Sequence, residues 1–200
     1  MTNPLEDAIG ETDIYLIDQI MKGRYQPQDV ILDAGCGYGR NLYWFLKNDC
    51  NIYGVDQNTA AITSLRNHLP PHLGEKFQQA ALETLPFDNN YFDHIICSAV
   101  LHFAKNTTHF HEMVAESTRV LKAGGSLFIR MTSDIGMEGK PKPIGDGVCQ
   151  IPDGSSRFLL TRTLLTEIRN KNKLSLLEPF KTVNVDDLRC MSTLVLKKES

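Results

Sequence analysis

Residues 30–41 read Val-Ile-Leu-Asp-Ala-Gly-Cys-Gly-Tyr-Gly-Arg-Asn, and this stretch decides the fold. Its apolar beginning predicts a buried strand over residues 29–34. Gly35, Gly37 and Gly39 follow, and glycine readily adopts the positive φ angles that let a ligand touch the backbone. A helix is expected over 40–47, with free N–H groups at its start. Strand, glycine turn and helix together predict a nucleotide-binding type of α/β unit.

The rest of the chain continues this alternation of strands and helices. We expect further helices at 12–24, 58–70, 107–121 and 163–171. Further strands are expected at 51–55, 76–80, 92–98, 126–131, 176–185 and 190–196. The last two can form a closing hairpin. The pattern predicts one domain over residues 1–200, with a doubly wound, mostly parallel sheet of seven strands covered on both faces.

Two carboxylates near the glycine turn indicate the kind of ligand. Asp33 precedes the first glycine, where it would repel a pyrophosphate but could accept a hydrogen bond from an ammonium group. Arg40 stands where a dinucleotide fingerprint needs glycine or alanine. Asp56, about 20 residues after Gly35, ends the second strand and can bind both ribose hydroxyls. Taken singly, each aspartate could equally be a turn or cap residue; together they predict an adenosine ligand that carries an amino acid.

Several segments resemble the class I S-adenosylmethionine (SAM)-dependent methyltransferases. VILDAGCGYGRN is similar to their first motif and NIYGVD to their second. ETLPFDNNYFDHIICSAVLHF and ESTRVLKAGGSLFIRM resemble the segments around strands four and five. The resemblance covers residues 30–133 and implies a Rossmann-like fold with strand order 3-2-1-4-5-7-6, strand seven antiparallel. The Gly-Arg-Asn turn and the MSTLVLKK terminus also resemble the tellurite-resistance methyltransferases, without assigning a substrate.

The resemblance also implies a role for each matching residue. Asp33, Gly35, Gly37 and Gly39 would surround the methionine part of SAM, and Ser98 would lie beneath it. Asp56 would hold the ribose, Gln57 would flank the adenine, and Arg40 could pair with the SAM carboxylate. Many relatives have an acid that meets the adenine amine, but this chain reads Ala-Leu-Glu-Thr-Leu-Pro-Phe at 81–87. There the N–H of Leu82 can still reach the adenine, and Glu83 can substitute for the acid.

The expected reaction is an in-line displacement of the methyl group onto a small-molecule acceptor, which needs alignment more than a catalytic residue. His102, just after strand four, is the best candidate base, although a packed histidine is the favoured alternative. Arg130 either contacts an anionic acceptor or faces outward. Residues 133–157, rich in glycine and proline, are expected to be a long loop. We expect this loop and residues 1–24 to cover the acceptor site.

Composition and charge narrow the classes of protein that fit this sequence. The net charge of -3 gives no reason to expect nucleic acid. Five cysteines without a CxxC pair predict neither disulfides nor a metal site. An acidic N-terminus and short apolar runs predict a cytoplasmic protein outside membranes. A nicotinamide-dependent oxidoreductase is disfavoured by Arg40 and Asp33. A SAM-binding protein without catalysis fits the motifs equally well, and the oligomeric state stays open.

Overall fold

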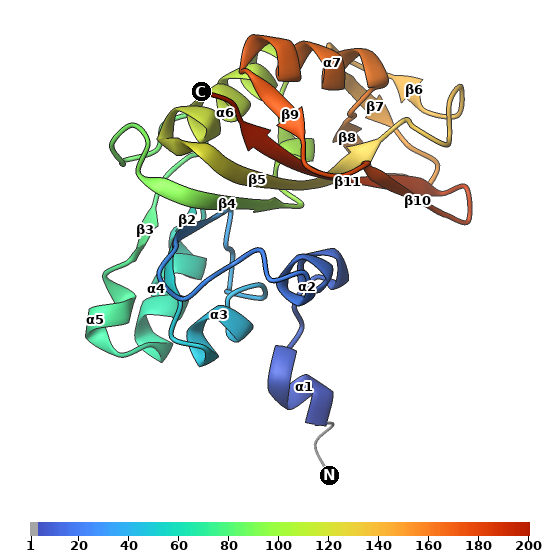
Figure 1. Cartoon of the computed structure of the whole chain (residues 1–200). Helices are drawn as coiled ribbons and strands as arrows, with labels where there is room; N and C mark the ends of the chain where they lie inside the picture. The colour runs from blue at the N-terminus through green and yellow to red at the C-terminus, as the bar shows by residue number, and fades with distance from the viewer. Residues whose placement is uncertain (1–3) are drawn as a thin grey trace.

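The computed structural model describes residues 4–200, which form a three-layer α/β structure (Figure 1). The helices are α1 (Pro4–Ile9), α2 (Ile14–Met21), α3 (Tyr43–Lys47), α4 (Thr59–His68), α5 (Pro71–Gly74), α6 (Thr107–Val120) and α7 (Arg162–Lys171), with a 3-10 helix, η1 (Leu101–Phe103). The strands of the large sheet are β1 (Val30–Ala34), β2 (Asn51–Asp56), β3 (Phe77–Gln79), β4 (Phe92–Ser98), β5 (Leu121–Ser133), β9 (Leu174–Leu176), β10 (Lys181–Val185) and β11 (Arg189–Lys198). None of the helices within 4–200 is long and apolar enough to cross a membrane.

The order of strands in the large sheet confirms the prediction. It runs β3-β2-β1-β4-β5-β11-β10, and the pairs from β3 to β5 are parallel. The last strand, β11, runs antiparallel to both β5 and β10. Because ligands bind at the carboxyl ends of parallel strands where the strand order reverses, the edge beside β1 and β4 is the expected position of a site.

The predicted strand over 176–185 is wrong in one respect, because it is broken into β9 and β10. Leu176 pairs with Leu196, and Lys181 pairs with Thr193, so both pieces lie along the same side of β11. Pro179 lies between them, and proline has no N–H to donate to a strand partner. The sheet therefore has eight strands rather than the expected seven.

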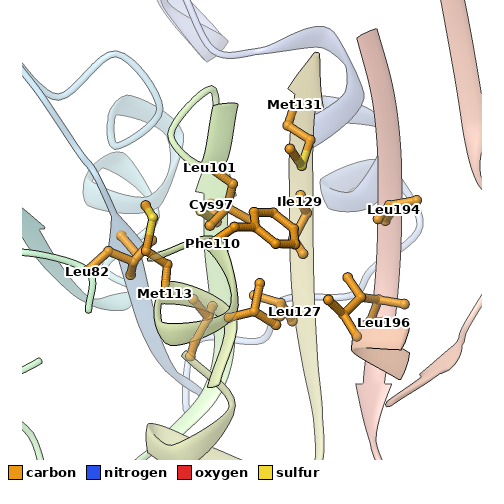
Figure 2. Close-up of a cluster of buried hydrophobic side chains, with 14 of the residues drawn as sticks. Leu82, Cys97, Leu101, Phe110, Met113, Leu127, Ile129, Met131, Leu194 and Leu196 are labelled. Atoms are coloured by element: carbon orange, nitrogen blue, oxygen red, sulfur yellow. The ribbon is translucent and has the colours of Figure 1, made fainter. Parts of the chain in front are cut away.

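Neighbouring residues of the central strands face opposite layers. Ile31 packs with α2, α3 and α4, while Leu32 packs with α6 and α7. In Figure 1 these two groups of helices lie on opposite sides of the sheet. Figure 2 shows the second layer, where Phe110 of α6 lies between Cys97 of β4 and Ile129 of β5. The expected coverage of both faces follows from this alternation, because each strand is buried on both sides.

Residues 133–157 do not form the predicted loop without secondary structure. They contribute most of a second, three-stranded antiparallel sheet of β6 (Lys142–Pro143), β7 (Val148–Gln150) and β8 (Ser156–Phe158). Gly147 has φ +73°, and a Cβ there would lie 2.2 Å from the ring of Phe158. The turn thus needs glycine, and the glycines interpreted as loop residues instead allow short strands to pack closely. We call residues 133–158 the arm.

Other boundaries also differ from the prediction. Strand β5 begins at Leu121, directly after α6, and not at residue 126, so Gly124 and Gly125 lie inside the strand. The helix expected from residue 40 begins at Tyr43, because the turn after Gly39 occupies the intervening positions. Helix α2 begins after the cap Asp13, and neither α1 nor α5 was predicted.

Candidate active site

A cavity of about 350 Å³ opens at the carboxyl edge of β1, β2 and β4. Five of the residues predicted from the sequence line it: Gly35, Asp56, Gln57, Leu82 and Glu83. They come from the glycine turn, the end of β2 and the segment after β3. The fold therefore brings the predicted ribose and adenine residues to one concave surface, which we call the first cavity.

The carboxylate of Asp56 is held in place by the backbone on both sides. Its Oδ2 accepts a hydrogen bond from the N–H of Gly37 at 2.8 Å, and its Oδ1 accepts one from the N–H of Asn58 at 2.8 Å. The Asn58 side chain in turn caps α4 by accepting from Ala60 and Ala61. Each carboxylate oxygen has a second lone pair, so both can still accept from a pair of neighbouring hydroxyl groups.

The glycine turn adopts the predicted left-handed backbone. The φ angles of Gly35, Gly37 and Gly39 are +87°, +54° and +91°. A Cβ on Gly35 would lie 2.2 Å from Val100 Cγ2, which itself lines the first cavity. The turn is thus packed against the segment after β4, and a side chain at Gly35 would push the two apart.

Asp33 lies at the end of β1 and is almost completely buried, with 1% of its surface exposed. Its Oδ2 has no hydrogen-bond partner among the described residues. Burial raises the pKa of this carboxyl to about 7; the nearby Arg40 opposes the rise and Asp56 adds to it. A buried acceptor without a partner is costly unless a ligand supplies a donor. An ammonium group would satisfy it.

Glu83 meets a histidine across the first cavity. Its Oε1 lies 3.2 Å from Nε2 of His109, whose Nδ1 accepts from the N–H of Lys105. Because Nδ1 accepts, the proton of the neutral ring is on Nε2, which lies near Glu83 but has no hydrogen-bond partner among the described residues. His109 and Lys105 also line the cavity, and the sequence analysis did not predict either as a site residue.

Comparison with known proteins gives the family. A model described as a methyltransferase domain matches residues 32–129, which include the glycine turn and Asp56. The chain is also 35% identical over 101 residues to the phthiotriol/phenolphthiotriol dimycocerosates methyltransferase of Mycobacterium leprae. That match covers 48% of this chain and 35% of the relative, so the chain spans about a third of that protein's length. The match over residues 32–129 and the strand order confirm the predicted resemblance to the class I SAM-dependent methyltransferases.

Solved structures agree on the fold of this methyltransferase domain. A SAM-dependent methyltransferase of Methanosarcina mazei superposes with a TM-score of 0.73 at 19% identity, covering 90% of this chain and 97% of the other. The 1,6-didemethyltoxoflavin-N1-methyltransferase of Burkholderia thailandensis, solved with bound 1,6-didemethyltoxoflavin and S-adenosylhomocysteine (SAH), gives a TM-score of 0.67 at 18% identity, covering 92% of this chain and 76% of the other.

The structure has a second cavity, of about 240 Å³, beside the first. Ala99, which follows β4, lines both. Four arginines line the second cavity: Arg40, Arg130, Arg157 and Arg189. They come from the glycine turn, β5, the arm and β11, four separate parts of the chain. Arg40 thus lies at the second cavity and not the first, and Arg130 is not an outward charge.

His102 also lines the second cavity, from η1, and is 7% exposed. Burial, together with the nearby charges of Arg157 and Arg130, lowers its pKa to about 4. Its Nδ1 accepts from the N–H of Thr132 at 3.4 Å and lies 3.2 Å from the Thr132 hydroxyl. The neutral ring therefore carries its proton on Nε2, which makes it a donor toward a ligand and not a base. The geometry favours the packed histidine over the catalytic base.

Asp13 was missed as a site residue. This buried cap of α2 places Oδ2 3.0 Å from Arg130 Nη1 and 3.9 Å from Arg40 Nη2. Its position before an apolar helix is a cap signal that the sequence offers, whereas the two arginine partners have no sequence signal. Ser98 is 6% exposed at the end of β4, and its hydroxyl, like Asp33 Oδ2, has no partner within the described residues.

Proposed function

We propose that this chain transfers the methyl group of SAM to a small-molecule acceptor in the cytoplasm. The single observation that carries the proposal is the buried, unpartnered Oδ2 of Asp33 at the start of the glycine turn. The amino group of SAM supplies the missing donor there, whereas the pyrophosphate of a nicotinamide cofactor would be repelled. The five cysteines are free, which supports a reducing compartment.

Residues of the first cavity and of the adjoining glycine turn together would hold SAM. Asp56 accepts from the ribose hydroxyls, and Gln57, Leu82 and Glu83 surround the adenine. Gly35, Gly37 and Gly39 allow the methionine part to lie against the backbone, above Ser98. Bound SAM supplies a methyl group activated by its sulfonium. The protein aligns the acceptor and excludes water, which accounts for much of the rate gain in such a displacement.

Electron pairs balance without a covalent enzyme intermediate. A lone pair of the acceptor forms the new bond to the methyl carbon while the carbon–sulfur bond breaks toward sulfur. SAH is left, and any proton on the attacking atom passes to water. His102 takes no part as a base in this proposal. We treat residues 1–200 as one domain in which residues 1–24 and 133–157 cover the acceptor; residues 1–3 of the first segment lie outside the described residues. Ile151, Asp153 and Ser155 of the arm support this covering role, because they line the second cavity.

Calorimetric titration with SAM, SAH and NADH tests the proposal. We expect SAM and SAH to bind and NADH not to bind. Asp56→Ala should weaken SAM binding by about tenfold or more, since it removes two charge-assisted hydrogen bonds. Asp56→Asn keeps one acceptor oxygen and shows whether a loss of binding comes from misfolding. Asp88→Ala, on the exposed segment before β4, is the matched control. Binding of NADH instead of SAM would overturn the proposal.

Turnover distinguishes an enzyme from a SAM-binding protein without catalysis. The intact protein is incubated with methyl-labelled SAM and a panel of thiols, phenols, carboxylic acids and metalloid oxyanions. Labelled product that disappears in Asp56→Ala and persists in Asp88→Ala is the expected result. Binding of SAM without any labelled product across the panel would favour the non-catalytic alternative.

A further inference from the structure

The lining of the second cavity is strongly basic although the whole chain is acidic. Four arginines and one carboxylate, Asp153, face it, while the chain has a net charge of -3. His102 adds a neutral hydrogen-bond donor. Such a concentration of guanidinium groups at one concave surface favours an anion, because arginine presents a planar pair of donors that fits carboxylate and phosphate oxygens.

Two of these arginines have donors left over. Arg157 donates from Nη1 to the carbonyl oxygen of Ser156 and lies over the ring of Phe103 at 5.1 Å. No carboxylate of residues 4–200 lies within ion-pair distance of it. Arg130 pairs with Asp13 through Nη1, but its buried Nε has no hydrogen-bond partner in the described chain. The four arginines share two carboxylates, Asp13 and Asp153, so an excess of positive charge remains, and a bound anion would offset it.

The other two arginines have acidic neighbours at longer range. Arg189 Nη1 lies 4.0 Å from Asp153 Oδ2, and Arg40 Nη2 lies 3.9 Å from Asp13. Asp153 is itself engaged, since its Oδ1 accepts from the N–H and the hydroxyl of Ser155. Arg130 and Arg157 are therefore the groups best placed to bind a ligand. Arg189 and Arg40 add positive electrostatic potential around that ligand.

The position of the second cavity connects it to the methyl donor. Ala99 forms a wall common to both cavities, with φ +62° and its N–H donated to the carbonyl oxygen of Arg130 at 2.7 Å. Ala99 directly follows Ser98, the residue expected beneath the methionine part of SAM. A molecule in the second cavity would thus lie beside the reactive end of a donor in the first, and not beside its adenine.

We propose that the second cavity is the acceptor site and that it selects a small acceptor bearing a carboxylate or phosphate group, which Arg130 and Arg157 hold. The inference rests on the proposed function, because only SAM in the first cavity makes the neighbouring cavity an acceptor site. The anion fixes the acceptor's orientation, so that another atom of the acceptor faces the methyl group.

Binding of simple aromatic anions tests the inference separately from methyl transfer. The full chain, with and without saturating SAH, is titrated calorimetrically with benzoate, phenyl phosphate and benzamide. We expect benzoate or phenyl phosphate to bind in the presence of SAH and the uncharged benzamide to bind at least about tenfold more weakly. The anion that binds more tightly indicates whether the charged group of the acceptor is a carboxylate or a phosphate.

Variants of Arg157 test whether the anion binds in the second cavity. Arg157→Gln should raise the dissociation constant of the preferred anion by about tenfold, and Arg157→Lys should restore part of the loss, because it keeps the charge without the planar donors. The dissociation constant of SAH should change by less than about twofold, since Arg157 does not line the first cavity. Arg162→Gln, an exposed arginine on α7 outside both cavities, is the matched control.

The outcomes separate the two proposals. Equal binding of benzoate and benzamide, or anion binding that survives Arg157→Gln unchanged, would overturn the anionic acceptor and leave the methyltransferase proposal standing. Failure of SAH to bind the intact protein would overturn the methyltransferase proposal and, with it, the assignment of the second cavity to an acceptor.

Discussion

Asp13 joins two parts of the fold through one side chain. Its Oδ2 lies 3.0 Å from Nη1 of Arg130 in β5, while its Oδ1 accepts from the N–H of Tyr15 and so caps α2. The ring of Tyr15 lies 5.1 Å from the same guanidinium. Helix α2 is therefore attached to the wall of the second cavity by a cap, an ion pair and an aromatic contact.

We expect Asp13→Ala to destabilise the protein by about 2 kcal/mol, from the lost cap and the unpaired, partly buried Arg130. Urea unfolding at neutral pH measures the change. A double-mutant cycle with Arg130→Ala should give a coupling of about 1 kcal/mol. Strictly additive losses would show that the ion pair contributes nothing to stability.

The pKa of Asp33 predicts a pH dependence with a definite sign. This carboxyl has a pKa of about 7 in the folded protein and an ordinary value of 3.8 when exposed, so the folded state binds its proton more tightly. The resulting stability is fully present below pH 3.8 and is lost as the pH rises through about 7. The difference in free energy of unfolding between wild type and Asp33→Asn, measured across this range, isolates the effect. A flat difference would contradict the burial argument.

Binding of SAM should show the opposite trend, because an ammonium group is held by the ionised carboxylate. We expect SAM affinity to rise with pH up to about 7 and then level off, by at most about tenfold per unit. Asp33→Asn should lower the affinity and flatten the profile. Equal profiles in the two proteins would show that Asp33 does not contact the amino group of SAM.

Two glycines with similar φ angles allow the cost of backbone strain to be distinguished from the cost of close packing. Gly35 has φ +87°, and a Cβ added there would meet Val100 at 2.2 Å, whereas Gly124 has φ +80° and a Cβ there would meet nothing within 4 Å. Gly124→Ala should cost about 1–2 kcal/mol of stability from backbone strain alone. Gly35→Ala should cost more and also abolish SAM binding, since the turn must move. Thermal unfolding and calorimetry measure both; similar costs for the two variants would contradict the packing argument.

Glu83 is predicted to accept a hydrogen bond from the adenine amine. Its carboxylate lines the first cavity and lies beside His109. Replacing the amine with oxygen, as in S-inosylhomocysteine, should weaken binding to the wild type by about tenfold relative to SAH. In Glu83→Gln this preference should shrink, whereas Glu112→Gln, exposed on α6, should keep it. An unchanged preference in Glu83→Gln would place the amine elsewhere.

The sequence by itself determined the parts of the fold whose causes are local. The apolar run before Gly35, the positive φ of three glycines and the Asn58 cap all follow from residue type and immediate spacing. Strand β4 has the predicted bounds, because its apolar residues are buried on both sides. Register within the parallel sheet then brings Asp33 and Asp56 to the same edge without further information.

Only the tertiary structure decided how the second cavity is built. Arg40, Arg130, Arg157 and Arg189 lie far apart in the chain, and no spacing in the sequence indicates that they meet. The strands of the arm are two or three residues long, too short to show a hydrophobic period, so their glycines and prolines predicted a loop. Sequence patterns report the surroundings of each residue along its own element, whereas contacts between distant segments depend on how the elements pack.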